Sequence, residues 1–257
     1  MTSLDFDKFL SGHVFAFLFL FSRIGAMLML FPGIGESFVS PRFRLMFALA
    51  ICLLLLEPML PRIPAPPEAI PELIKMICYE IIIGLFFGTL LRFLLSTLEA
   101  TGSVIAIQTG LSNATILSPA LAIQSPLVNA FLSAIGVTLL FVSGMDAMLL
   151  RGVVSIYDVF PPGGVLMPGD MAQTVIQMAN KSFTVGIELA MPFLVIGILM
   201  YVALGIMQKL MPQVQLFLIA LPIQIWGGFA LLSITIAGIM TIWLQYADKT
   251  IGAILSP

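Results

Sequence analysis

Hydrophobic residues occur in six long runs along the chain, and polar or proline-rich stretches separate them. The runs cover 14–31, 43–56, 73–98, 127–150, 183–206 and 213–244. Long runs without the alternation of a half-buried strand are typical of helices. Pro and Gly gather between the runs, as in Pro161-Pro162-Gly163-Gly164 and then Pro168-Gly169, and both residues stop helices. The pattern predicts an all-α protein of helical hairpins, organised as a single unit over 1–257.

The predicted helices differ in how well they suit lipid. A helix that crosses the hydrocarbon core needs about 20 consecutive, mostly apolar residues. Three stretches carry no charge and meet this requirement: 127–145, 189–208 and 210–247. The three earlier runs contain charges or, in 43–56, are too short, so we expect those helices to lie against protein rather than lipid. The last run is too long for one straight crossing, and we expect it to bend or break at Pro222 and Gly227-Gly228.

The composition strengthens this picture and excludes several classes of function. Of the 257 residues, 60% are hydrophobic and 9% are charged, and the mean hydropathy is +1.13. So few charges cannot cover a soluble globule, and the outer surface must therefore face lipid or other protein. The net charge of −2 provides no basic field for nucleic acid, so no nucleic acid partner is expected.

Catalytic chemistry is not expected from this sequence. The chain has one histidine, His13, and lacks a nucleophile elbow, a phosphate-binding Gly-rich loop and paired metal-ligand spacing. Its two cysteines, Cys52 and Cys78, lie in apolar runs and are interpreted as core thiols. We therefore predict a protein that is not an enzyme and that has no cofactor and no metal site.

Five ionisable residues lie inside or beside the apolar runs, where such residues are candidates for function. They are Arg23, Glu80, Arg92, Asp146 and Glu188. A structural interpretation competes with the functional one. Arg92, Asp146 and Glu188 stand near the ends of runs, from which side chains can reach water. Arg23 and Glu80 are deepest, and we expect each to pair with a helix of this chain or of a partner.

Two glycines within the third run point to a close helix contact. Gly84 and Gly88 have the small-xxx-small spacing that lets another backbone approach closely. Glycine is common in membrane helices, so the spacing fits generic packing as well as a specific contact between subunits.

The stretch 101–130 is the most informative part of the sequence. It is rich in small and neutral polar residues and contains no charge. It is too polar for a lipid span, whereas a loop exposed to water is expected to carry charge. Irregular backbone at membrane depth occurs only where protein surrounds it or where it lines an aqueous cavity. We interpret 108–125 as a re-entrant or pore-facing loop, with an ordinary connector as the alternative.

Several short motifs, in their order and spacing over nearly the whole chain, resemble one family. The motifs are Ser22-Arg23-Ile24-Gly25, Phe31-Pro32-Gly33-Ile34-Gly35, Pro41-Arg42-Phe43-Arg44, Gln108-Thr109-Gly110-Leu111-Ser112-Asn113-Ala114, Pro161-Pro162-Gly163-Gly164 with Ser155, and a segment from Gly205 through Pro212, Gln213, Gln215 and Phe217 to Leu221-Pro222. Together they resemble the FliR family, which supplies the single-copy membrane subunit of the bacterial flagellar type III export gate.

The resemblance implies a division of the chain and two functional segments. It implies a FliP-like part over 1–182 and a FliQ-like helical hairpin over 183–257. The segment 108–125 is then the plug of the conduit, with gate residues Gln108, Gly110, Leu111, Ser112, Asn113, Ala114, Ile116, Ser118 and Pro119. The turn of the hairpin and its partner contacts then involve Lys209, Pro212, Gln213, Gln215, Phe217 and Pro222.

The resemblance also implies partners and a location. The partners are FliP-like and FliQ-like subunits in one hetero-oligomer, FlhB-like and FlhA-like export proteins, unfolded flagellar export substrates and membrane lipid. The location is the bacterial inner membrane, as a multi-pass protein of the flagellar basal body. Three other interpretations stay open: the export-gate subunit of a virulence injectisome, a secondary transporter and a membrane enzyme.

Overall fold

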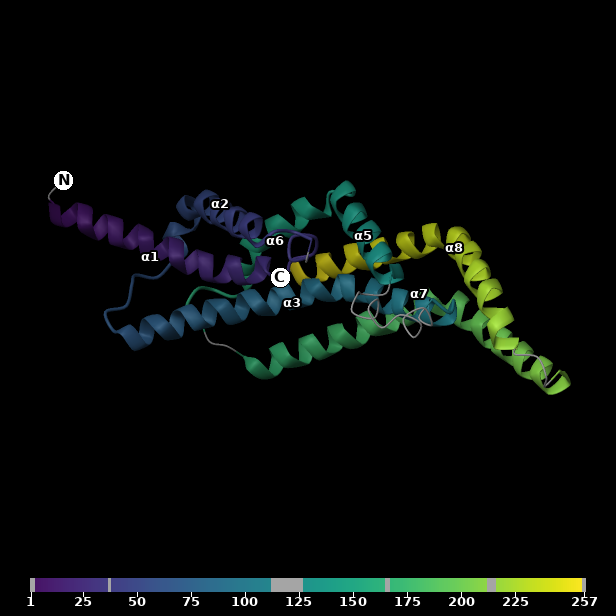
Figure 1. Ribbon diagram of the computed structural model, residues 1–257. Helices are drawn as coiled ribbons and strands as arrows, with labels where there is room; N and C mark the ends of the chain where they lie inside the picture. The colour runs from purple at the N-terminus through teal and green to yellow at the C-terminus, as the bar shows by residue number, and fades with distance from the viewer. Residues whose placement is uncertain (1–2, 37, 112–126, 165–166, 212–215, 256–257) are drawn as a thin grey trace. The chain divides into compact units, whose positions relative to one another are not determined.

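The computed structural model describes residues 3–36, 38–111, 127–164, 167–211 and 216–255. The regular elements among these residues are all helices, with no strand (Figure 1). The prediction of an all-α fold is confirmed. The elements are α1 (Ser3–Leu28), α2 (Pro41–Met59), the 3-10 helix η1 (Leu60–Arg62), α3 (Ile70–Gln108), α5 (Leu127–Val142), α6 (Met145–Val159), α7 (Pro168–Leu210) and α8 (Leu216–Leu255).

Proline begins two of these helices. Pro41 is the first residue of α2, and the Ser40 hydroxyl accepts a hydrogen bond from the Phe43 N–H at 3.3 Å, which caps the helix. Pro168 is likewise the first residue of α7. The interpretation of Pro168-Gly169 as a helix stop was therefore wrong. Proline fits the first turn because the N–H that it lacks has no helical partner there.

The predicted run 127–150 is not one helix. α5 ends at Val142 and α6 begins at Met145, and the two are bent by 76°. Gly144 lies at the break with φ 75°, a backbone conformation that glycine adopts at low cost. Hydrophobicity alone missed this break because it continues across the glycine.

The last run, which was expected to bend or break, does not break. α8 runs as one helix of 40 residues through Pro222, and its course is curved (Figure 1). At about 1.5 Å per residue, a helix of this length extends roughly 60 Å. A proline removes one helical hydrogen bond, and here it does so without ending the helix.

Among the described residues, four helices are long and apolar enough to cross a membrane: Pro41–Arg62, Ile70–Gln108, Pro168–Leu210 and Ala220–Ile254. The expectation that only the last three runs suit a span was wrong for α2 and α3, because both helices extend beyond the apolar runs. The pair α5 and α6 passes the same test only as one bent span. In α3, 56% of the most apolar window is buried by protein, against 17–22% in the other three helices. Of these four helices, α3 is thus the one that this chain covers most.

The described chain forms two compact units, each assembled from separate stretches of sequence. Unit 1 comprises Met1–Phe93, Met145–Met178 and Ile251–Pro257, and unit 2 comprises Leu94–Gly144 and Ala179–Thr250. This grouping by compactness does not test the division into 1–182 and 183–257, which stays a prediction.

In unit 1, α1 packs against α2 and against the first part of α3. Gly84 and Gly88 of α3 make the second contact possible. A Cβ atom at Gly84 would lie 2.2 Å from the Arg23 carbonyl oxygen, and one at Gly88 would lie 3.0 Å from Leu30 Cβ. The small-xxx-small pair therefore serves a contact within this chain.

In unit 2, the core is built around Trp243, whose side chain is fully buried. Its indole N–H donates to the Leu94 carbonyl oxygen at 2.9 Å. Gly136 of α5 faces the same place, because a Cβ atom there would lie 2.3 Å from Leu98 Cδ1 and 3.3 Å from the Trp243 ring. α3, α5 and α8 thus meet around one indole.

Candidate functional site

Most of the predicted plug lies outside the described residues: Ser112, Asn113, Ala114, Ile116, Ser118 and Pro119. The structure does describe the two places where the chain enters and leaves this segment. We call them together the plug anchor, defined by Gln108, Thr109, Gly110, Asn129 and the side chains that hold them. All of these residues belong to unit 2.

The entry to the segment is held by a glutamine of α8. The Gln224 side-chain amide is 2% exposed and donates to the Gln108 carbonyl oxygen at 2.8 Å and to the Tyr201 hydroxyl at 3.2 Å. The Gln108 carbonyl belongs to the last turn of α3, where helical acceptors have no partner in the helix. Gln224 therefore caps the C-terminal end of α3 from a residue 116 positions away in sequence.

Gly110 directs the chain away from α3. It has φ 73°, the left-handed conformation that commonly ends helices at glycine. It also packs on Gln224, since a Cβ atom at Gly110 would lie 3.2 Å from the Gln224 Oε1 atom. Both the backbone angle and the limited space favour glycine at this position.

Two further glycines bring α7 and α8 onto the same end of α3. A Cβ atom at Gly228 of α8 would lie 2.3 Å from Thr109 Cγ2, and one at Gly197 of α7 would lie 2.1 Å from Gln108 Oε1. The last turn of α3 is thus packed against glycine surfaces of both helices. Such contacts allow close approach without interlocking side chains.

The exit from the segment is held on α3 as well. The Asn129 amide in α5 donates to the Ser103 hydroxyl at 2.8 Å. Gly102 leaves room for this contact, because a Cβ atom there would lie 2.6 Å from Asn129 Oδ1. The described residues that flank the segment, Gln108 and Asn129, therefore both lie at the last two turns of α3, and each takes part in a neutral hydrogen bond.

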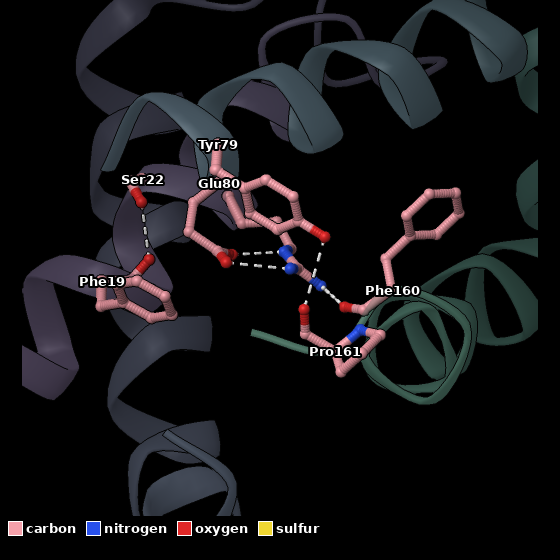
Figure 2. Close-up of polar contacts among 7 residues, drawn as sticks. Phe19, Ser22, Tyr79, Glu80, Phe160 and Pro161 are labelled. Atoms are coloured by element: carbon pink, nitrogen blue, oxygen red, sulfur yellow. Dashed lines mark hydrogen bonds and ion pairs between the residues drawn. The ribbon is translucent and has the colours of Figure 1, made fainter. Parts of the chain in front are cut away.

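The buried charges form a separate arrangement in unit 1. Arg23 of α1 and Glu80 of α3 are 2% and 0% exposed, and their side chains pair through two contacts, Nε to Oε2 at 2.5 Å and Nη2 to Oε1 at 3.0 Å. The Nη1 atom of the guanidinium donates to the Phe160 carbonyl oxygen at 2.9 Å, as the dashed lines in Figure 2 show. The guanidinium also lies over the Tyr157 ring, 4.1 Å from its centroid.

This pair fastens a turn between two helices. Phe160 follows α6, and the Tyr79 hydroxyl beside Glu80 donates to the next carbonyl oxygen, that of Pro161, at 3.5 Å (Figure 2). The guanidinium donors are directed at a carboxylate and a carbonyl, which is the arrangement of a buried structural pair. Arg23 and Glu80 thus join α1 and α3 to the turn after α6.

The other three candidate charges lie apart from this pair. Arg92 lies within α3 and forms an ion pair with Glu36. Asp146 is in the first turn of α6, where a negative charge favours the helix N-terminus. Glu188 is exposed and lies midway along the 43-residue α7, not beside a connector as the sequence suggested.

The predicted hairpin turn is only partly described. Pro212, Gln213 and Gln215 lie outside the described residues. Lys209 is exposed in the last turn of α7, Phe217 lies in the first turn of α8, and Pro222 is exposed within α8. Their partner contacts stay a prediction.

Sequence reasoning missed Gln224 and Tyr201 and placed Cys78 wrongly, since its thiol is exposed whereas that of Cys52 is buried. A signal for Gln224 was present, because it is a neutral amide inside a long apolar helix and such a group needs a partner. Its partner could not be named from the sequence, because α3 and α8 are far apart along the chain.

Comparison with known proteins gives one consistent result. The sequence matches the family described as Bacterial export proteins, family 1, over residues 14–250. A relative from Caulobacter vibrioides, named Flagellar biosynthetic protein FliR, is 32% identical over 90% of this chain and 92% of its own length. A protein of the same name from Bacillus subtilis is 27% identical over 92% of this chain and 92% of its own length. Another from Escherichia coli is 24% identical over 82% of this chain and 80% of its own length. The chain therefore belongs to the FliR family of bacterial export proteins.

Proposed function

We propose that this chain, a component of the flagellar protein export apparatus, completes an inner-membrane conduit for unfolded flagellar proteins and closes it with residues 108–125. Its contribution is structural, since it shapes and blocks a passage and performs no chemical step. The partners are FliP-like and FliQ-like subunits in one hetero-oligomer, with FlhB-like and FlhA-like export proteins beside it in the basal body.

The observation that carries the proposal is the plug anchor beside an uncharged polar segment. A segment that must let chemically varied chains pass benefits from carrying no charge, because a fixed charge would attract or repel parts of each chain. It must also start and end at fixed points if it is to return to the same closed position. Gln224 on Gln108 and Asn129 on Ser103 provide those points on one helix.

The apolar outer faces favour a subunit over a solitary transporter. Only 17–22% of the most apolar windows of α2, α7 and α8 is buried by this chain. A secondary transporter needs ionisable residues grouped at its site, whereas Arg23 and Glu80 are occupied by each other and by the Phe160 carbonyl. The remaining exposed apolar surface suits helices of partner subunits.

Purification of the tagged full chain from flagellated cells tests membership of the gate. We expect FliP-like and FliQ-like subunits to co-purify in detergent, and the purified chain alone to move no small solute in liposomes. A stable, folded monomer without partners, or saturable transport of a small solute by the chain alone, would contradict the proposal.

Deletion of 112–119 tests the plug in cells. We expect the deleted chain to assemble with its partners and the cells to become permeable to small dyes, whereas wild-type cells exclude them. A chain with Gly and Ser residues of equal number in place of 112–119 separates the loss of length from the loss of side chains. A deleted chain that assembles and keeps the membrane tight would remove the plug assignment.

A further inference from the structure

α7 presents an exposed apolar stripe with one acidic residue in it. Met191, Val195, Leu199 and Val202 recur at intervals of three or four residues and are 52–64% exposed. This spacing places them on one face of the helix. Glu188 belongs to the same face, because it precedes Met191 by three residues and Val195 by seven.

Glu188 has no cation beside it in the described part of the chain. The ion pairs there join Arg23 to Glu80, Arg62 to Asp158 and Arg92 to Glu36. The nearest basic residues along α7 are Lys181 and Lys209, seven and 21 positions away. The carboxylate thus has no ion-pair partner there. On the same face, Met191 and Val195 follow Glu188, and the exposed Thr184 and Lys181 precede it by four and seven residues.

A second, independent feature adds another acceptor at the same level of the helix. Pro192 lies inside α7, and proline has no N–H to donate. In a continuous helix, the N–H of residue 192 would bond to the carbonyl oxygen of residue 188. The Glu188 carbonyl oxygen is therefore left without its helical donor, and position 188 offers a carboxylate and a free carbonyl together.

An acceptor pair of this kind on an apolar face needs a donor from outside the chain. A carboxylate facing hydrocarbon is costly, and so is an unpaired backbone carbonyl. Lysine and arginine supply several donors and a positive charge, and arginine in particular can serve two acceptors at once. The stripe that follows Glu188 along α7 is apolar, so the occupant must be apolar where it lies against that stripe.

We propose that this face of α7 docks a membrane helix of another gate subunit, whose single lysine or arginine bonds to the carboxylate and carbonyl of Glu188. The inference rests on the proposed function in one respect, namely that the chain works within a hetero-oligomer. It adds the face that is covered, the residue that fixes its register and the chemistry of the partner.

The test compares four variants of the full chain in flagellated cells: Glu188→Gln, Glu188→Leu, Glu188→Lys and the control Asp170→Lys. Asp170 is exposed in the first turn of the same helix, so its reversal changes net charge equally. The measurement is the amount of membrane subunit that co-purifies, divided by the amount of this chain in the membrane. Glu188→Lys is expected to lower this ratio about tenfold or more, because it opposes two cations in a buried contact.

The neutral variants distinguish pairing of Glu188 with a cation of a partner from simple contact of this face with lipid. Glu188→Leu improves the fit of α7 to lipid, so a face that touches only lipid would give a wild-type ratio, and that result would overturn the inference. Docking on a cation predicts a lower ratio for Glu188→Leu, with Glu188→Gln between it and wild type because an amide still accepts a hydrogen bond. An unchanged ratio for Asp170→Lys is expected; an equal loss in the control would also overturn the inference.

Charge exchange identifies the occupant. Each Lys or Arg within an apolar helix of the co-purifying subunits is changed to Glu in cells that carry Glu188→Lys. One of these changes is expected to restore the ratio and swimming, and rescue by none, or only by a lysine or arginine of a second copy of this chain, would contradict the proposed partner. If the wild-type chain co-purifies with no membrane subunit, the proposed function itself fails. If the wild-type chain co-purifies with its partners and the Glu188 variants give the same ratio, this inference alone fails.

Discussion

The contacts inside unit 1 differ in chemistry from the contacts inside unit 2. Unit 1 contains the buried ion pair of Arg23 and Glu80, to which the Phe160 carbonyl and the Tyr157 ring contribute further contacts. Unit 2 contains neutral hydrogen bonds, such as those from Gln224 to Gln108 and between Ser182 and Tyr246. Close helix contacts at glycine occur in both units.

The two kinds of contact also differ in the free energy that is lost when one partner is removed. Breaking one partner of a buried ion pair leaves an uncompensated charge, which costs about 3–5 kcal/mol, so such a pair holds its helices in one arrangement. A neutral hydrogen bond contributes about 0.5–1.5 kcal/mol and can be exchanged for another. Unit 1 thus contains a contact that is costly to break, and each of the neutral contacts in unit 2, which carries the plug anchor, costs less to break.

The largest effect is expected from removing one member of the buried pair. Glu80→Ala should lower the free energy of unfolding by about 3–5 kcal/mol, because it leaves the buried Arg23 guanidinium without its carboxylate. The measurement is denaturant titration of the purified chain in mild detergent. Arg62→Ala is the matched control, because it breaks the Arg62–Asp158 pair, whose side chains are 46% and 60% exposed, and it should cost about 1 kcal/mol or less.

The double variant Arg23→Met with Glu80→Leu sharpens this result. Two apolar residues of similar size should restore most of the lost stability, because neither buried charge then lacks a partner. If stability and swimming both return, the pair is structural. A stable double variant that does not swim would contradict the view that these charges only hold the unit together.

A smaller effect is expected at the contact of α1 with α3. Gly84→Ala places a Cβ atom where the Arg23 carbonyl oxygen lies 2.2 Å away, so overpacking should cost about 1–3 kcal/mol. Gly205→Ala is the matched change in an open helix position, with no atom within 4 Å of the added Cβ. It should stabilise the chain by about 0.5–1 kcal/mol. Equal effects of the two substitutions in the same titration would contradict the close contact.

The smallest change in stability is expected at the plug anchor, but with a functional consequence. Gln224→Met keeps the length of the side chain and removes its hydrogen bonds to Gln108 and Tyr201, at a cost of about 1–2 kcal/mol. Since the end of α3 then loses its cap, we expect dye entry into cells to rise above the wild-type level. Tyr246→Phe removes a neutral bond to Ser182 elsewhere in unit 2 and should leave the membrane tight. Equal permeability of the two variants would remove the special role of Gln224.

Much of the fold followed from the sequence, and the errors have physical causes. Apolar runs located every long helix, because the hydrophobicity of a segment can be read from its own residues. They failed where one glycine decided the outcome, as at Gly144, and where Pro168 began a helix instead of ending one. α3 also extends ten residues beyond its apolar run, into the neutral polar stretch, where the Thr101 hydroxyl bonds to the Thr97 carbonyl oxygen one turn earlier.

The candidate site was less predictable. The absence of charge over 101–130 identified the region, since charge is a property of sequence alone. The anchoring contacts were not predictable, because Gln224 and Gln108 are 116 positions apart and their meeting depends on how α3 and α8 pack. The position of Glu188 was misjudged for a related reason: its distance from a connector depended on where α7 begins.

Conductance across a planar bilayer tests the central claim most directly. The assembled gate is purified with the wild-type chain or with the chain that lacks 112–119, and the current is measured at equal protein density. The wild-type assembly is expected to be closed, and the deleted assembly to conduct steadily, because residues 112–119 are proposed to fill the passage. Two assemblies of the same subunit composition that are both closed, or both equally conducting, would contradict the claim that this segment plugs the conduit.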